Sequence, residues 1–171
     1  IGVGAGLSYD VAGPTHHSLE DISIIRTLPN ILIFSPSDLS LAKKFLDYSI
    51  AVKKPKYIRL DGKPLPRIYE DKDIKNMKLE DGFYELLKGK KVCLVATGYM
   101  THKSVSVAKK LSQNGINIGV IDVFLLRPFN EDLFFKSITK YNHIITIEEA
   151  FINKGGLDSL ISSILDKKNS S

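Results

Sequence analysis

Residues 92–123, with the sequence VCLVATGYMTHKSVSVAKKLSQNGINIGVIDV, contain a complete strand–helix–strand pattern. The apolar run 92–96 is typical of a strand that is buried on both faces. We expect Thr101 to cap the helix that follows and Asn114-Gly115 to close it. Residues 116–123 then predict a second strand. A strand, a crossover helix and a further strand are typical of a parallel βαβ unit.

The same alternation continues in both directions along the chain. Further strands are predicted at residues 1–3, 31–34, 57–60 and 144–147, and further helices from about residues 18, 38, 130 and 157. In the first of these helices we expect Ser18 to be the cap and Asp21 its partner. Right-handed crossovers place helices on both faces of such sheets. We therefore predict an α/β fold of parallel sheets with helices on both faces.

Residues 61–89 interrupt this pattern with charges, two prolines and weak apolar periodicity. We interpret most of this stretch as an interdomain linker, with a short helix near residues 84–87. The predicted division is a first domain at residues 1–66, a linker at residues 67–89 and a second domain at residues 90–171.

The composition limits the classes of function. The 171 residues are 43% hydrophobic and 25% charged, which is ordinary for a globular protein. The net charge is +5, but the four arginines do not form a stripe with aromatic residues, so we expect no nucleic-acid partner. No apolar stretch approaches the about 18 residues that span a membrane, so we expect no membrane partner. The single cysteine, Cys93, indicates a reducing, cytoplasmic location.

The sequence Gly13-Pro14-Thr15-His16-His17 lies between a predicted strand end and a helix start. In open α/β sheets, ligands bind in loops beyond the carboxyl ends of strands. A histidine there can donate, accept or transfer a proton near neutral pH. Two surface histidines in a helix-capping loop would give the same pattern, and the motif by itself leaves both interpretations open.

Arg59 closes the strand at residues 57–60 and is a second candidate. A guanidinium matches a phosphate group with two parallel hydrogen bonds. The alternative is an ordinary salt bridge, for example with Asp61. We expect Glu148-Glu149 to be structural or interface residues, and Gly155-Gly156 to form a tight turn.

An ordered set of short motifs resembles the transketolase family. The first group looks like the second half of the pyrimidine-binding domain of transketolases and deoxyxylulose-phosphate synthases: Gly13-Pro14-Thr15-His16, Glu20-Asp21, Arg26-Thr27-Leu28-Pro29-Asn30 and Ser35-Pro36-Ser37-Asp38. The second group resembles the C-terminal domain of the same superfamily: Ala96-Thr97-Gly98, residues 122–129, Ile147-Glu148-Glu149 and Gly155-Gly156. The resemblance spans nearly the whole chain in the expected order.

The resemblance implies the cofactor thiamine diphosphate with Mg²⁺, bound between the pyrimidine domain of one subunit and the pyrophosphate domain of another. It places His16 beside the substrate as a hydrogen-bond donor or proton shuttle, with His17 as a secondary candidate. It assigns Arg59 to the substrate phosphate. Many transketolases have an acidic residue directly before the Gly-Pro-Thr-His motif, where this chain has Ala12. Asp10 could substitute only in a rearranged loop, which favours a transketolase-like enzyme with a different sugar substrate.

The resemblance also implies that the chain is only part of such an enzyme. The family's catalytic glutamate and its magnesium-binding pyrophosphate domain have no counterpart in this sequence. We therefore expect no turnover by the chain alone, and an N-terminal transketolase subunit as partner in a homodimer or heterotetramer. The alternatives are a deoxyxylulose-phosphate synthase, the β subunit of a 2-oxoacid dehydrogenase E1, or a non-catalytic dimerisation module. The Gly-Pro-Thr-His motif argues against the E1 β subunit.

Overall fold

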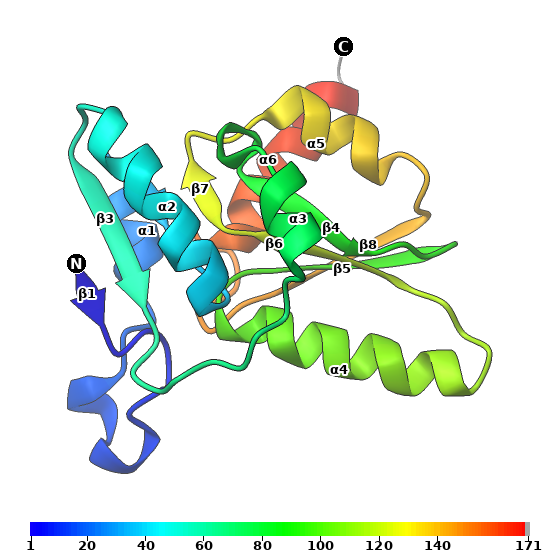
Figure 1. Ribbon diagram of the computed structural model, residues 1–171, viewed down its shortest axis with the longest axis horizontal. Helices are drawn as coiled ribbons and strands as arrows, with labels where there is room; N and C mark the ends of the chain where they lie inside the picture. Colours follow the sequence, from blue (N-terminus) through cyan, green and yellow to red (C-terminus); the bar gives the residue numbers. More distant parts are fainter. Residues whose placement is uncertain (170–171) are drawn as a thin grey trace.

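Two four-stranded sheets organise the chain in the computed structural model, which describes residues 1–169 (Figure 1). Their strand orders are β1-β3-β2-β7 and β4-β6-β5-β8. Most neighbouring strands are parallel, as the sequence predicts. The exceptions are β7 and β4, which each run antiparallel to their neighbour. The sheets are therefore mixed rather than wholly parallel.

The first sheet is built mainly from the N-terminal part of the chain. Its strands are β1 (Gly2–Val3), β3 (Lys56–Leu60), β2 (Leu32–Phe34) and β7 (Leu125–Arg127). Helix α1 (Asp21–Arg26) packs through Ile22 in the same cluster as Ile33. Helix α2 (Leu39–Ala51) packs through Leu41 and Phe45 in the cluster that contains Leu32 and Phe34. Successive residues of a strand point to opposite faces, so the two helices cover opposite faces of β2.

The second sheet contains β4 (Phe83–Leu87), β6 (Gly119–Val123), β5 (Val92–Ala96) and β8 (His143–Ile147). Helix α4 (Tyr99–Gln113) lies along one face, and Ala108 of this helix packs with Leu94 and Val120 (Figure 1). Helices α5 (Glu131–Ile138) and α6 (Leu157–Asn169) cover the other face. The unit predicted at residues 92–123 is thus confirmed as β5, α4 and β6.

One hydrophobic cluster joins the two sheets. It includes Ile22 and Ile33 from the first sheet and its helix, and Val95, Ile121 and Leu157 from the second. Strand β7, which follows β6 in the chain, pairs with β2 and so completes the first sheet. The two parts of the chain therefore share a core and a strand.

Several local predictions were wrong. The helix expected near residues 84–87 is strand β4, whose Phe83 and Tyr84 point into different clusters with the period of a strand. Thr101 does not cap α4, because this helix begins at Tyr99 and Thr101 is fully buried inside it. Ser18 does not cap α1 either, because this helix begins at Asp21 and Glu20 occupies the cap position.

The segment between β3 and β4 also contains helix α3 (Asp71–Asn76) and a 3₁₀ turn, η3 (Leu79–Asp81). Tyr69, Met77 and Leu79 from this segment are buried in the same cluster as Phe34 and Phe45. It is thus packed against the core rather than extended through solvent. Within residues 1–169, no helix has the length and apolarity that crossing a membrane requires.

Candidate active site

A closed loop between β1 and α1 presents three of the four candidate residues. Gly6 N donates to Ser18 O at 3.1 Å, and Ser18 N donates to Gly6 O at 2.9 Å, so the ends of the loop are tied together. Between them lie two 3₁₀ turns, η1 (Asp10–Ala12) and η2 (Pro14–His16). Gly13 joins the turns at φ 77°, a conformation that favours glycine. The loop therefore displays Asp10 and His16 at its surface.

The two histidines of the loop have different environments. His16 is exposed, and its Nδ1 lies 3.0 Å from the Thr15 hydroxyl. Its Nε2 makes no hydrogen bond within residues 1–169 and is available to a ligand. His17 is half-buried, and its Nε2 is buried without a hydrogen-bond partner in the described structure.

Arg59 is buried beneath this loop, with only 5% of its side chain exposed. Its Nε donates to Asp21 Oδ2 at 2.7 Å, and its Nη2 donates to Ser18 O at 3.3 Å. Tyr57 donates to the same Asp21 oxygen at 2.8 Å. The salt bridge of Arg59 is thus formed with Asp21 and not with Asp61. Burial, and then the nearby Asp21 carboxylate, raise the pKa of Tyr57 to about 12.

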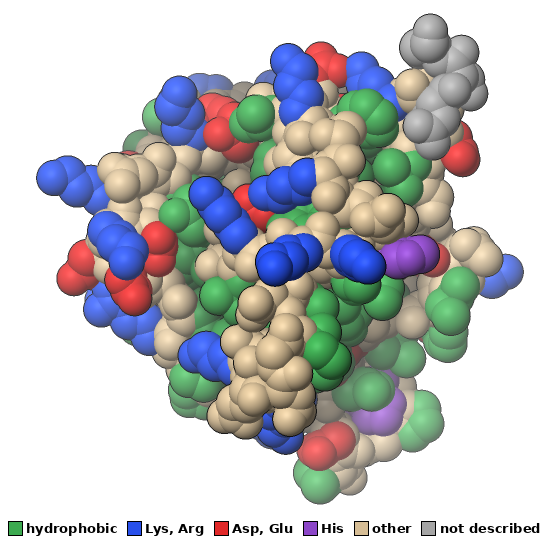
Figure 2. Space-filling view, turned by 90° about the vertical axis from the view of Figure 1, so that its right-hand side faces the viewer, with side chains coloured by type: hydrophobic (Ala, Val, Ile, Leu, Met, Phe, Trp, Pro, Cys, Tyr) green, Lys and Arg blue, Asp and Glu red, His purple; other side chains and the backbone are tan. Residues whose placement is uncertain are grey.

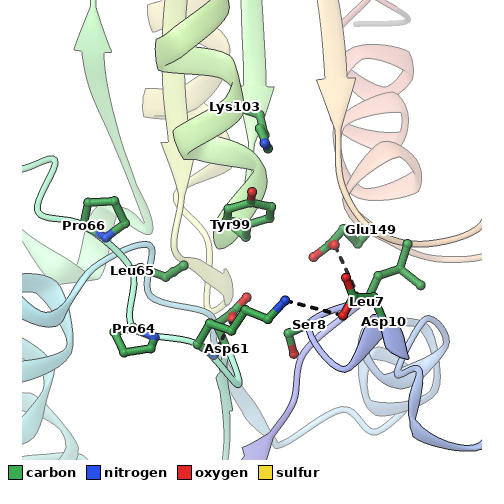
Figure 3. Close-up of a pocket in the computed structure, with 11 residues that line it drawn as sticks. Leu7, Ser8, Asp10, Asp61, Pro64, Leu65, Pro66, Tyr99, Lys103 and Glu149 are labelled. Carbon is green, nitrogen blue, oxygen red and sulfur yellow. Dashed lines mark hydrogen bonds and ion pairs between the residues drawn. The ribbon is translucent and has the colours of Figure 1, made fainter. Parts of the chain in front are cut away.

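A cavity of about 570 Å³ opens beside the loop, where the two parts of the chain meet (Figure 3). We call it the seam cavity. It is lined by Leu7, Ser8 and Asp10 of the loop, by Asp61 and residues 63–66 after β3, by Tyr99 and Lys103 of α4, and by Glu149. Asp10 is the only predicted site residue among them; His16, His17 and Arg59 do not line the cavity.

The carboxylates of the seam cavity all have partners. Lys63 Nζ lies 3.5 Å from Asp10, and its backbone N donates to Asp61 at 2.8 Å. Leu7 N donates to Glu149 at 3.4 Å, which fixes the loop to the residues after β8. Burial of Glu149 raises the pKa of its carboxyl, although the Leu7 amide opposes this.

Lys103 stands out among the charged groups of the cavity. Its Nζ lies 5.1 Å from the centre of the Tyr99 ring, and no carboxylate of the described residues forms an ion pair with it. Lys63, Tyr99 and Lys103 were not among the residues predicted from the sequence. The available signal was their position, because they follow the carboxyl ends of β3 and β5, where ligand sites of α/β sheets lie.

The remaining acidic and glycine motifs have structural contacts. Glu148 Oε1 accepts from Asp158 N at 2.9 Å, while its Oε2 is buried without a partner in residues 1–169. Arg26 donates to the carbonyl oxygens of Gly155 and Gly156 at 2.5 and 2.6 Å. These contacts connect α1 to the start of α6, as expected for residues with a structural role.

The positive charges on the surface are spread rather than gathered into one patch on the face that Figure 2 shows. On the face shown in Figure 2, lysine and arginine side chains are distributed with apolar and neutral surface between them. Within the described residues, no group of three histidine, cysteine, aspartate or glutamate side chains could hold a metal ion.

Two sheets that share a core define a two-part α/β protein, and its sequence matches one family over both parts. Residues 1–66 match the family described as "Transketolase, pyrimidine binding domain", and residues 84–170 match "Transketolase, C-terminal domain". The chain belongs to the transketolase family.

Individual relatives agree with this assignment. The chain is 38% identical to one subunit of the apulose-4-phosphate transketolase of Actinobacillus succinogenes, over 96% of this chain and 52% of the relative. It is 32% identical to a 6-deoxy-6-sulfo-D-fructose transketolase subunit of Clostridium sp. (strain MSTE9), over 96% of this chain and 50% of the relative. A solved structure described as "Split gene transketolase, inactive beta4 tetramer" superposes with a TM-score of 0.82 and 29% identity, over 97% of this chain and 52% of that one. The chain thus spans about half the length of these relatives.

Proposed function

We propose that the chain is part of the second subunit of a split transketolase, which transfers a ketol unit between sugar phosphates. The observation that carries this proposal is the exposed His16, displayed by a closed loop in a chain of the transketolase family. The relatives from Actinobacillus and Clostridium are subunits of transketolases acting on a sugar phosphate and a sulfonated sugar. These relatives support an enzyme that is built from two separate subunits. They also support a substrate other than the common pentose phosphates.

The cofactor of this proposal is thiamine diphosphate with Mg²⁺. It supplies the carbanion chemistry when it is bound, while protein groups orient and polarise the substrate. His16 fits a place beside such a group, because the loop holds its ring outward with Nε2 available. We assign the Mg²⁺ and diphosphate ligands to the pyrophosphate domain of the partner subunit.

The proposed roles follow from the contacts of each residue. The Thr15 contact fixes one nitrogen of His16, so that Nε2 can hold or transfer a proton at a substrate oxygen. His17, with its unpartnered Nε2, lies beside it as a secondary substrate contact. Asp10 faces the seam cavity and is placed to accept hydrogen bonds from substrate hydroxyl groups. Arg59 uses Nε and Nη2 within the chain, so its contact with a substrate phosphate would use Nη1.

The proposal extends to the assembly and to the limits of the domains. We assign residues 1–66 to the pyrimidine-binding part, residues 67–89 to the connection and residues 90–171 to the C-terminal part, and the end of this connection, strand β4, pairs with β6 of the C-terminal part. The partner is an N-terminal transketolase subunit in a homodimeric or heterotetrameric enzyme. The chain alone is proposed to be inactive, because the pyrophosphate domain comes from that partner. A cytoplasmic location remains a prediction from the single cysteine, which is buried.

The test compares His16→Ala with His143→Ala in the full protein assembled with its partner subunit. His143 is also exposed, but it lies at the start of β8 and lines no part of the proposed site. We expect His16→Ala to lower kcat for ketose cleavage by about 10²- to 10⁴-fold, as for the loss of an acid–base group. His143→Ala should leave kcat unchanged, and both variants should bind thiamine diphosphate with Mg²⁺ in a calorimetric titration.

Two results would count against the proposal. If the assembled wild-type protein binds no thiamine diphosphate, the chain is a non-catalytic module that has the fold. If it binds the cofactor but His16→Ala cleaves ketose at the wild-type rate, the assignment of His16 is wrong.

A further inference from the structure

Helix α2 is apolar on the side that faces solvent as well as on the side that packs in the core (cyan in Figure 1). Leu39, Leu46 and Ile50 are 65%, 61% and 62% exposed, and we call them the outer stripe. With about 3.6 residues per turn, these positions lie within about 40° of one another around the helix axis. Leu41 and Phe45 are buried on the opposite side. A surface helix usually has one apolar stripe, toward its core, so the outer stripe is a second one.

A groove extends the outer stripe beyond the N-terminal end of the helix. Its volume is about 310 Å³. Besides three charged residues, it is lined by Pro36, Leu39, Ala42, Leu60, Pro64 and Leu65. Leu39 belongs to both features, so the outer stripe and the groove form one continuous apolar surface. Contiguous apolar surface of a globular protein is typical of a place where another protein binds.

The charges beside the outer stripe select the partner. Lys43 and Asp47 are both exposed and lie on the same flank of the stripe, at about 40° and about 80° from Leu39 around the axis. In an antiparallel pair of α2 helices, related by a two-fold axis near position 45, these flanks meet and Lys43 of each copy lies opposite Asp47 of the other. A parallel pair would place this flank against the opposite one, where Ala42 and Ser49 offer the charges no partner. The helix is therefore complementary to itself in one direction only.

The same antiparallel arrangement matches the apolar residues. It brings Ile50 of one copy to Leu39 of the other, at the edge of the groove, and the contact occurs twice by symmetry. Leu46 lies near the axis and meets its own copy. A helix of 13 residues is about 20 Å long, which by itself is too small for a stable contact of about 800 Å² per partner. The groove supplies additional surface, so the outer stripe and the groove act together.

We propose that the outer stripe and the groove bind a second copy of this chain, with the two α2 helices antiparallel about a two-fold axis. The charged flank selects this occupant, because the same helix supplies both members of each ion pair. The surface lies on the opposite face of the first sheet from α1, and neither His16 nor Arg59 belongs to it. The inference goes beyond the proposed function, since this pairing does not depend on turnover of a sugar.

The experiment uses the full protein assembled with its partner subunit and introduces one thiol, Leu46→Cys. Mild oxidation should link two copies of this chain through these thiols, because the proposed axis passes near them, and a non-reducing gel measures the rate. Val107→Cys is the matched control, at a position that is 46% exposed on α4. It should link about tenfold more slowly, since a disulfide forms only where two thiols come close together. The native Cys93 is buried and is present in both proteins.

The charged flank is tested in the same Leu46→Cys protein. Lys43→Asp should slow the linkage by about five- to tenfold, because like charges then face each other at two symmetric places. Asp47→Lys alone should have the same effect. The two changes together should restore the rate, because they exchange the members of each ion pair and leave the pairing intact.

Equal linkage rates at positions 46 and 107, or a rate that does not respond to the charge changes, would overturn the inference. Linkage of position 46 to the partner subunit would mean that this subunit covers the outer stripe, and would overturn it as well. The same conclusion would follow if a maleimide failed to label this thiol in dilute protein, because another segment of the same chain would then cover it. These measurements need neither cofactor nor sugar, so their outcome is independent of the test of His16.

Discussion

At the scale of single residues, the most unusual group is the Asp122 carboxylate at the end of β6. It is fully buried, and its oxygens accept hydrogen bonds from the hydroxyl groups of Ser37, Tyr69 and Thr101. Burial raises the pKa of Asp122 from 3.8 to about 6, and the three hydroxyl groups limit that rise. Asp122 thus joins β6, α4, the start of α2 and the segment after β3.

This group makes stability depend on pH in a defined direction. Its pKa is higher in the folded chain than in the unfolded chain, so folding favours the protonated form. The contribution to stability is complete below pH 3.8 and is lost as the pH rises to about 6. The loss amounts to about 3 kcal/mol at most, from 1.36 kcal/mol per pKa unit.

We predict that Asp122→Asn removes this part of the pH dependence. Urea unfolding of the two proteins, measured between about pH 4 and about pH 7, should show the wild type losing stability relative to the variant as the pH rises. Burial also raises the pKa values of Glu148 and Glu149, but both titrate in both proteins and cancel in the comparison. Parallel curves for the two proteins would show that Asp122 does not titrate in this range.

The sequence predicted the positions of some candidate residues in the fold better than it predicted their hydrogen-bond partners. His16 and Arg59 could be located because a loop or a strand end precedes them, and short-range patterns define such positions. Asp21 could not be identified as the partner of Arg59, since 38 positions separate the two residues in the chain. The common position of Lys103 and Asp10 could not be predicted either, because the two residues line one cavity only after both parts of the chain have folded.

At the scale of elements, helices α2 and α5 each begin at a side-chain cap, and the two caps differ in how many contacts they make. Asp38 is 4% exposed, and it accepts from Leu41 N in α2 and from the amides of Ile68 and Tyr69. Asn130 caps α5 through one amide, that of Leu133. Asp38 therefore fixes a helix and also the segment that leads to β4.

We predict that Asp38→Ala destabilises the protein by about 3 kcal/mol and Asn130→Ala by about 1 kcal/mol. The first change leaves two buried amides and one partly buried amide without their acceptor, whereas the second removes an ordinary cap. Thermal or urea unfolding of the two variants measures the difference. Equal losses would mean that the contacts of Asp38 with residues 68 and 69 add nothing to the cap.

Strand β4 and the start of helix α4 were predicted wrongly, because the contacts that determine them come from residues far away in the sequence. Strand β4 has only five residues and an antiparallel neighbour, β6, more than 30 positions away, so local periodicity could not separate it from a short helix. Thr101 has the side chain of a helix cap, but its hydroxyl is used by Asp122, 21 positions later. The start of α2 near residue 38 was easier to predict, because the residues that begin a helix are its neighbours in the sequence.

At the scale of the whole molecule, the two sheets share one hydrophobic core. Ile33 is fully buried in the cluster that contains Val95 and Ile121, and β7 belongs to the first sheet although it follows the second sheet's β6. The seam cavity is lined by residues of both parts, Asp10 from the first and Lys103 from the second. The shape of this cavity therefore depends on how the two parts pack against each other.

We predict that Ile33→Ala destabilises both sheets together, by about 2–5 kcal/mol, because the cavity it creates lies in their shared core. Hydrogen exchange should show the amides of β2 and β3 and those of β5 and β6 losing protection by the same free energy. Val107→Ala, at a position 46% exposed on α4, is the control and should change stability by about 0.5 kcal/mol or less. Loss of protection confined to β2 and β3 would mean that the two sheets unfold separately, and that the seam cavity can open without unfolding of the second sheet.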